Sequence, residues 1–143
     1  MIHNEHERRV AMRKLADLVA SLQHRQSKPV PRGRNPEMHE LANAGLASQI
    51  EQLELELVEY TELTTGIMSV TISFDQIDDL GAELIRARLA RGLSQRALAE
   101  EVGIAEGVIR RYERERYAST SLRRITEIIS VLRNSKGSAA KAS

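Results

Sequence analysis

The sequence predicts a mainly α-helical protein with an N-terminal helical dimerisation region that contains one short strand, followed by a small domain of several helices. Three observations support this fold class: apolar residues recur at helical spacing along most of the chain, only one segment alternates with a period of two, and the charges fall into blocks of opposite sign. With 143 residues, the chain has room for one core or two small modules. We expect the dimerisation region over 1–74, the second domain over 75–133 and a flexible tail over 134–143.

The overall charge of +1 hides a strong asymmetry. Residues 1–34 carry 8 basic and 3 acidic side chains, residues 35–80 carry 10 acidic side chains and no Lys or Arg, and residues 81–143 carry 13 basic and 7 acidic side chains. Such blocks indicate that one part of the chain meets a polyanion while another meets protein. A solvated face is an equally common explanation for any single block.

The first block predicts an amphipathic helix from about Asn4 to Gln26. Asn4 suits the N-cap position, and Ala11, Leu15, Leu18 and Leu22 repeat at helical spacing. Residues 27–34, SKPVPRGR, contain two Pro and a Gly and predict a loop.

A second helix is predicted to begin at Asn35, with Pro36 at the first helical position. Its apolar residues step by 4, 3, 4 and 3 in a short heptad pattern, formed by Leu46, Ile50, Leu53, Leu57 and Tyr60. Two heptads are too few to establish a coiled coil, and an ordinary helix packed on a neighbour is the alternative. The opposite charges of the two helices favour their pairing, either within one chain or between subunits.

Residues Met68 to Phe74 alternate apolar and polar side chains, which predicts a strand with one buried face. A single strand leaves both edges unpaired, so the same strand of a second subunit is its expected partner. An extended linker packed on helices is the alternative.

Residues 79–132 contain four short helical patterns. The first runs over Leu80 to Ala90 and stops at Gly92. The second runs from Gln95 to Val102, with Ser94 as its N-cap, and ends at Gly103. The third runs from about Ala105 to Arg114. The fourth begins after Ser119 or Ser121, with an apolar stripe of Leu122, Ile125, Ile128, Ile129 and Leu132.

The spacing in the middle of this region predicts a helix-turn-helix. Ala99 is small enough for two helices to cross closely, Gly103 turns the chain four residues later, and Ile109 and Tyr112 face inward from the second helix of the pair.

The run RxxRGLSQxxLAxxxGI, followed by a helix ending in RxYE, resembles the phage-repressor and Cro (XRE) family of helix-turn-helix DNA-binding domains over roughly Leu80 to Arg133. The N-terminal helices together with IRRYERERYASTSL resemble, more weakly, XRE regulators and HigA-like antitoxins with an N-terminal helical extension.

The resemblance implies which residues meet double-stranded DNA. The position of Gln95 lies beside a phosphate or a base edge, and those of Glu106, Gly107 and Arg111 face bases in the major groove. An Arg at 111 can donate two hydrogen bonds to guanine. We expect the remaining cations and the cap to neutralise or hold phosphates: Ser94, Arg96, Arg110, Arg114, Arg116 and Arg123.

Two positions depart from the family pattern. Glu106 is anionic where many relatives place a neutral or basic side chain, although a carboxylate can accept from cytosine N4. Gly107 lacks a side chain where an amide often reads adenine, and it weakens a helix by about 1 kcal/mol relative to Ala. We therefore expect either modest affinity recovered by dimerisation or readout concentrated on Arg111 and Gln95.

Catalysis and cofactors are not predicted. The chain has no Cys, no GxSxG and no Gly-rich phosphate loop, and its four His lie in the first 39 residues without a third ligand at metal spacing. No apolar run is long enough for a membrane span. We expect a cytoplasmic, homodimeric transcriptional regulator, most simply a repressor. The alternatives are an antitoxin-like or adaptor protein whose acidic segment binds a partner such as a toxin, and a purely structural interaction protein.

Overall fold

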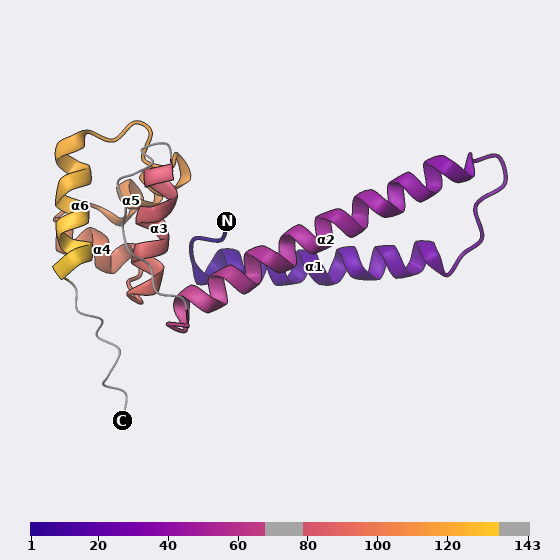
Figure 1. The fold of residues 1–143 in the computed structure, drawn as a ribbon, viewed down its shortest axis with the longest axis horizontal. Coiled ribbons are helices and arrows are strands. Elements are labelled where there is room, and N and C mark those ends of the chain that lie inside the picture. The colour runs from indigo at the N-terminus through magenta and orange to yellow at the C-terminus, as the bar shows by residue number, and fades with distance from the viewer. Residues whose placement is uncertain (68–78, 135–143) are drawn as a thin grey trace, which may run out of the picture. The chain divides into compact units, whose positions relative to one another are not determined.

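The computed structural model describes residues 1–67 and 79–134, and its described part contains six helices and no strand (Figure 1). The helices are α1 (Glu5–Gln26), α2 (Pro36–Thr64), α3 (Leu80–Ala90), α4 (Gln95–Val102), α5 (Glu106–Arg114) and α6 (Leu122–Asn134). The chain divides into two compact units, Met1–Glu59 and Tyr60–Ser143. The mainly α-helical class is therefore confirmed. The expected strand over 68–74, the expected boundary after 74 and the expected tail beyond 134 lie outside the described residues.

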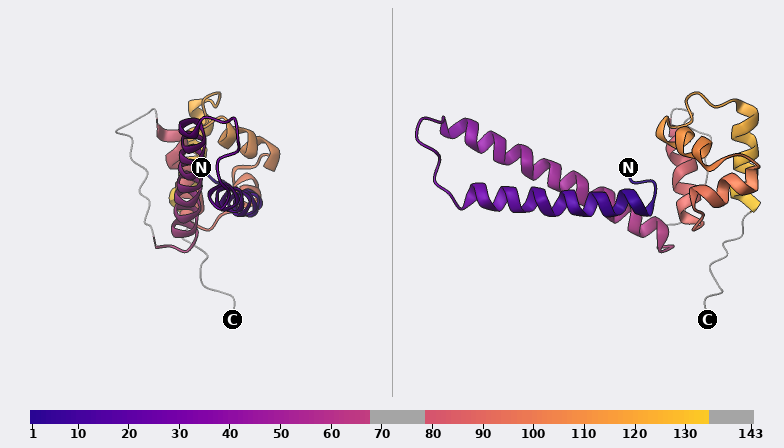
Figure 2. Two further views of the ribbon diagram at one scale, coloured as in Figure 1. Left: turned by 90° about the vertical axis from the view of Figure 1, so that its right-hand side faces the viewer. Right: turned by 180° about the vertical axis from the view of Figure 1, so that it is seen from behind.

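The first unit is an antiparallel hairpin of α1 and the larger part of α2 (Figures 1 and 2). Near the loop, Arg25 Nε donates to Asn43 Oδ1 at 2.9 Å. At the other end of the hairpin, the amino group of Met1 lies 3.0 Å from Glu56 Oε2. The structure thus contains the pairing within a single chain, and pairing between subunits stays a prediction.

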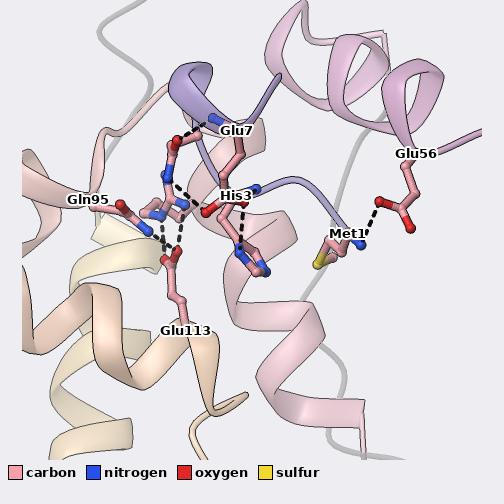
Figure 3. A network of polar contacts seen from close by, with 8 residues as sticks. Met1, His3, Glu7, Glu56, Gln95 and Glu113 are labelled. Carbon is pink, nitrogen blue, oxygen red and sulfur yellow. Dashed lines mark hydrogen bonds and ion pairs between the residues drawn. The ribbon is translucent and has the colours of Figure 1, made fainter. Parts of the chain in front are cut away.

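Both helices of the hairpin begin where the capping residues predicted. The side chain of Asn4 accepts from the backbone N–H of Glu7 at 2.9 Å, and Glu7 in turn accepts from the backbone N–H of His3 at 2.9 Å (Figure 3). Asn35 Oδ1 accepts from the N–H of Glu37 at 2.9 Å. Side-chain acceptors thus satisfy N–H groups that a helix start leaves without intrahelical partners.

The hairpin buries little apolar surface of its own. Ala11 is buried, but the leucines of the α1 stripe and the heptad residues of α2 up to Leu57 are only half-buried. Four large apolar side chains of α2 are more than half exposed: Met38, Leu41, Leu55 and Val58. Two helices with so little common core are marginal in isolation, because helices in proteins are stabilised mainly by burying an apolar face.

The second unit contains α3, α4, α5 and α6, which lie together as a small bundle (Figure 1). Its buried apolar side chains come from every one of these helices. They include Leu84, Ile85, Leu98, Ile109, Ile128 and Leu132, each almost inaccessible to solvent. This largely aliphatic core holds the helices that carry the candidate site.

One residue of the predicted α6 stripe was wrongly placed. Leu122 is 80% exposed, while Ile128, Ile129 and Leu132 are buried. Leu122 is the first residue of α6 and lies on the same face as Ile129, seven residues later, but the neighbouring elements do not cover this end of the helix. The apolar contact of α6 with the rest of the unit therefore begins about one turn later than the pattern indicated.

Candidate nucleic-acid interface

Three local features define α4 and the turn that follows it. Ser94 Oγ accepts from the N–H of Ala97 at 3.0 Å and caps the start of α4. Gly103 ends the helix with a φ of +77°, a conformation that glycine adopts without strain. The N–H of Ile104 then donates to the carbonyl of Ala99 at 2.9 Å, and Ala99 itself is buried. The last two features set the angle at which the chain enters α5.

Helix α5 has one buried face and one exposed basic face. Ile109 and Glu113, one turn apart, are fully buried. On the opposite side, Gly107, Arg110, Arg111 and Arg114 are exposed at positions i, i+3, i+4 and i+7, which lie along one side of a helix. The arginines that were expected to approach DNA therefore stand on a common surface, and Gly107 leaves the start of that surface without a side chain.

A buried polar cluster anchors the inner face of α5 (Figure 3). Arg88 of α3 donates to Glu113 through Nε at 2.6 Å and through Nη2 at 2.8 Å. Arg88 Nη1 also donates to the carbonyl of Leu93 at 2.7 Å, and the side-chain amide of Gln95 donates to Glu113 Oε2 at 2.8 Å. The guanidinium and the carboxylate are 2% and 0% exposed, so the pair is stabilised by its hydrogen bonds and not by water.

Arg88 and Glu113 were not assigned a role from the sequence. A signal for them exists: Arg88 lies four residues after Leu84 and Glu113 four residues after Ile109, so each charge falls on the apolar face of its helix. Buried charges of opposite sign are found paired, because an unpaired one is very costly. This pattern could have indicated a link between α3 and α5.

Gln95 lies in the interior and not on the exposed face that carries the arginines. It is buried, and its amide nitrogen is bonded to Glu113. The side chain thus positions α5 relative to the start of α4. The contact with a phosphate or base that the family resemblance implied for this residue stays a prediction.

The exposed arginines of α5 differ in how they are held. The Arg111 guanidinium carbon lies 5.7 Å from the centroid of the Tyr112 ring, within cation–π range. Arg110 Nη2 lies 2.5 Å from Glu106 Oε1, four residues earlier on the same helix. Glu106 therefore neutralises one cation of the surface in the free protein. Arg114 and the following Arg116 are exposed, and no ion pair to either occurs within the described residues.

The remaining predicted phosphate contacts lie on α4 and α6. Ser94 is exposed but its hydroxyl caps α4. Arg96 is exposed and lies 2.9 Å from Glu100 Oε1, a hydrogen bond that raises the pKa of the guanidinium. Arg123, at the start of α6, is exposed and lies 3.4 Å from Glu127 Oε1.

The chain leaves α5 through a strained turn that is packed tightly on α3. Arg116 and Tyr117 adopt φ values of +49° and +61°, which non-glycine residues rarely do. A Cβ atom built on Gly81 would lie 2.0 Å from the carbonyl oxygen of Arg116. The backbone of this turn can therefore approach α3 only because residue 81 has no side chain.

The arrangement of α4 and α5, with a glycine turn between them and a basic outer face on the second helix, is that of a helix-turn-helix DNA-binding domain. A protein-family model described as Helix-turn-helix matches residues 84–136. This part of the chain thus belongs to the helix-turn-helix family of the phage-repressor and Cro type, as the sequence motif indicated, and the protein is a DNA-binding regulator of that general class. Residues 1–83 lie outside the match. Comparison with curated proteins and with solved structures gives no match.

Among residues 1–67 and 79–134, no group of three or more His, Asp or Glu side chains is placed to hold a metal ion. None of the helices in that part of the chain combines the length and apolar character that crossing a membrane requires.

Proposed function

We propose that the protein is a dimeric, sequence-specific transcriptional repressor of the cytoplasm that inserts α5 into the major groove of double-stranded DNA. The observation that carries the proposal is the single exposed face of Gly107, Arg110, Arg111 and Arg114, opposite the buried Ile109 and Glu113. Arg111 reads guanine, and Arg110 and Arg114 neutralise phosphates. Occupation of a promoter then blocks transcription.

The other residues predicted to contact DNA support the insertion of α5, because they are available for the phosphates at the edges of the major groove. The capped N-terminus of α4, at Ser94, offers backbone N–H groups to a phosphate. Arg96, Arg116 and Arg123 are exposed cations in the same unit. Glu106 favours cytosine in the operator by accepting a hydrogen bond from its amino group, once the Arg110 side chain turns to the DNA backbone.

Dimerisation is assigned to the N-terminal region. The hairpin has little core of its own and leaves Met38, Leu41, Leu55 and Val58 of α2 more than half exposed, which favours a second copy as its partner. In a symmetric dimer, two copies of α5 meet half-sites about 34 Å apart.

A second function is favoured by the charge of α2. This helix carries seven Glu and no Lys or Arg, so it offers an acidic surface to a basic protein. In this alternative, the chain is an antitoxin-like or adaptor protein, and DNA binding by α5 serves autoregulation.

The DNA-binding proposal is tested by footprinting the full chain on the DNA upstream of its own gene over a salt series. Arg111→Ala should relax the sequence preference, whereas Arg114→Ala should keep the preference and lower the salt slope by about one unit. Equal binding by both variants and the unchanged chain would contradict insertion of α5.

The dimer is tested separately with a chain that begins at Tyr60 and keeps the whole second unit. Its mass by sedimentation should be that of a monomer, and its affinity for the operator should fall sharply. A dimer of unchanged stability would exclude the hairpin as the dimerisation element. Capture of a basic protein by the full chain, lost when Glu51, Glu54 and Glu62 are replaced by Gln, would favour the alternative function.

A further inference from the structure

The loop between α1 and α2 carries a block of positive charge that the helix-turn-helix does not use. From residue 18 to residue 36 the chain contains Arg25, Lys28, Arg32 and Arg34 and no Asp or Glu. Arg25 is bonded to Asn43, but Lys28, Arg32 and Arg34 are exposed, and none of these three has an ion pair among the described residues. The end of the hairpin is therefore a strongly cationic surface.

Two of these cations are displayed by an ordered turn. The N–H of Arg34 donates to the carbonyl of Pro31 at 3.1 Å, and Gly33 between the two arginines has a φ of +88°. A hydrogen-bonded turn with a glycine of positive φ at its third position is the type II pattern. Pro31 fixes its own φ and stiffens the entry to the turn. Arg32 and Arg34 are thus held on either side of a glycine before any ligand arrives.

The side of the turn at Gly33 is open. A Cβ atom added there would meet no other atom within 4 Å. The backbone can therefore come close to a ligand surface at Gly33, and the exposed side chains of Arg32 and Arg34 flank that point in the chain. Close approach of the backbone between two cations suits a narrow, negatively charged groove.

We propose that the turn Arg32–Gly33–Arg34 binds the minor groove of A·T-rich duplex DNA. The minor groove of A·T tracts is narrow and has an enhanced negative potential that attracts inserted arginines. Guanidinium groups suit this site because they are planar and more weakly hydrated than the ammonium of lysine. Lys28, on the rim of the loop, contacts a phosphate. This site is separate from the major-groove surface of α5 and does not depend on it.

The test measures binding of the full chain to two duplexes that lack the operator, one of A·T pairs and one of G·C pairs, by fluorescence anisotropy over a salt series. The unchanged chain should bind the A·T duplex about tenfold more tightly, and netropsin, which occupies the minor groove, should displace it. Arg32→Gln with Arg34→Gln should lower the salt slope by about two units.

Two further variants separate groove binding from simple charge attraction. Arg32→Lys with Arg34→Lys keeps both charges, so the salt slope should persist while the A·T preference disappears. Gly33→Asn keeps a residue that tolerates positive φ but fills the open side of the turn, and it should also remove the preference. The matched control, Arg9→Gln with Arg13→Gln, removes two exposed cations of α1 and should leave the preference intact.

The proposal is overturned if the unchanged chain binds both duplexes equally, or if the preference survives in the lysine pair and in Gly33→Asn. It is also overturned if the same arginines are needed for binding to phosphatidylserine vesicles and not to duplex DNA, which would make the loop a membrane contact. Arg111→Ala should relax operator recognition without changing the A·T preference. Failure of the α5 proposal and failure of this one therefore give different results.

Discussion

Arg88 of α3 and Glu113 of α5 form a buried ion pair with two hydrogen bonds, and Gln95 from the start of α4 bonds the same carboxylate. The pair therefore joins the scaffold of the domain to the inner side of the helix whose outer side carries the basic surface. A carboxylate fixed in this way sets the rotation of α5 about its axis. We infer that the pair positions Arg110, Arg111 and Arg114 without touching DNA itself.

Replacing Glu113 by Gln should lower the free energy of unfolding by about 3–5 kcal/mol, because the Arg88 charge stays buried without its partner. The measurement is urea denaturation followed by circular dichroism. The control is Glu100→Gln, which breaks an exposed ion pair with Arg96 and should leave the stability nearly unchanged.

The double variant Arg88→Met, Glu113→Met should recover much of the stability lost in Glu113→Gln, since it removes both buried charges. If Glu113→Gln were as stable as the unchanged chain, the claim that this pair stabilises the domain would be wrong.

Replacing a glycine by alanine should have opposite effects at positions 81 and 107. Gly81→Ala puts a Cβ atom against the backbone oxygen of Arg116, so either the helix or the turn must move, and the midpoint of denaturation should fall clearly. Gly107 is exposed in α5 with no atom within 4 Å of an added Cβ, so Gly107→Ala should stabilise the domain by up to about 1 kcal/mol. Thermal unfolding of both variants checks the signs. A stabilising Gly81→Ala would contradict the close packing of this turn on α3.

Stability should decline at alkaline pH because of Tyr117. Burial raises the pKa of its phenol above the ordinary value of 10, with the negative charge of Glu113 adding to the effect and Arg88 opposing it. The unfolded chain therefore loses this proton at a lower pH than the folded chain. The contribution of Tyr117 to stability is complete below pH 10 and is lost as the pH rises toward the folded pKa, at about 1.4 kcal/mol per pH unit.

Tyr117→Phe removes the titrating group and should flatten this part of the pH profile. The Tyr117 hydroxyl is buried and makes no hydrogen bond within the described part of the chain, so its removal should cost little stability at pH 7 and can raise it by about 1 kcal/mol. Urea midpoints at neutral and alkaline pH give both comparisons. An equal alkaline decline in Tyr117→Phe would assign the effect to other groups.

Replacing Glu106 by Gln should strengthen binding to non-specific DNA. The substitution removes a negative charge from the surface of α5 and releases Arg110 from its ion pair, so the salt slope should rise by about one unit. Stability should change by less than about 1 kcal/mol because the pair is exposed. Glu127→Gln, which releases Arg123 and Arg124 on α6, provides the comparison. Unchanged affinity for non-specific duplex would show that Glu106 does not face DNA.

Local patterns were sufficient to predict where the helices begin and end. Asn4, Asn35 and Ser94 cap the helices that they were expected to cap, and Gly103 ends α4 as expected. These boundaries depend on interactions within a few residues, so they can be read from the chain itself. Leu122 was misplaced because apolar periodicity shows which residues share a face but not how far the neighbouring elements cover that face.

The amino-acid sequence by itself determined the helical class, the helix-turn-helix spacing and the basic stripe on α5, because all three follow from residue order along one helix or one turn. Only the tertiary structure decided that Gln95 is buried, that Arg88 and Glu113 meet across 25 positions in the chain, and that Gly81 receives the backbone of Arg116. Contacts between residues far apart in sequence depend on how helices pack, and the spacing of residues within each helix does not contain that information.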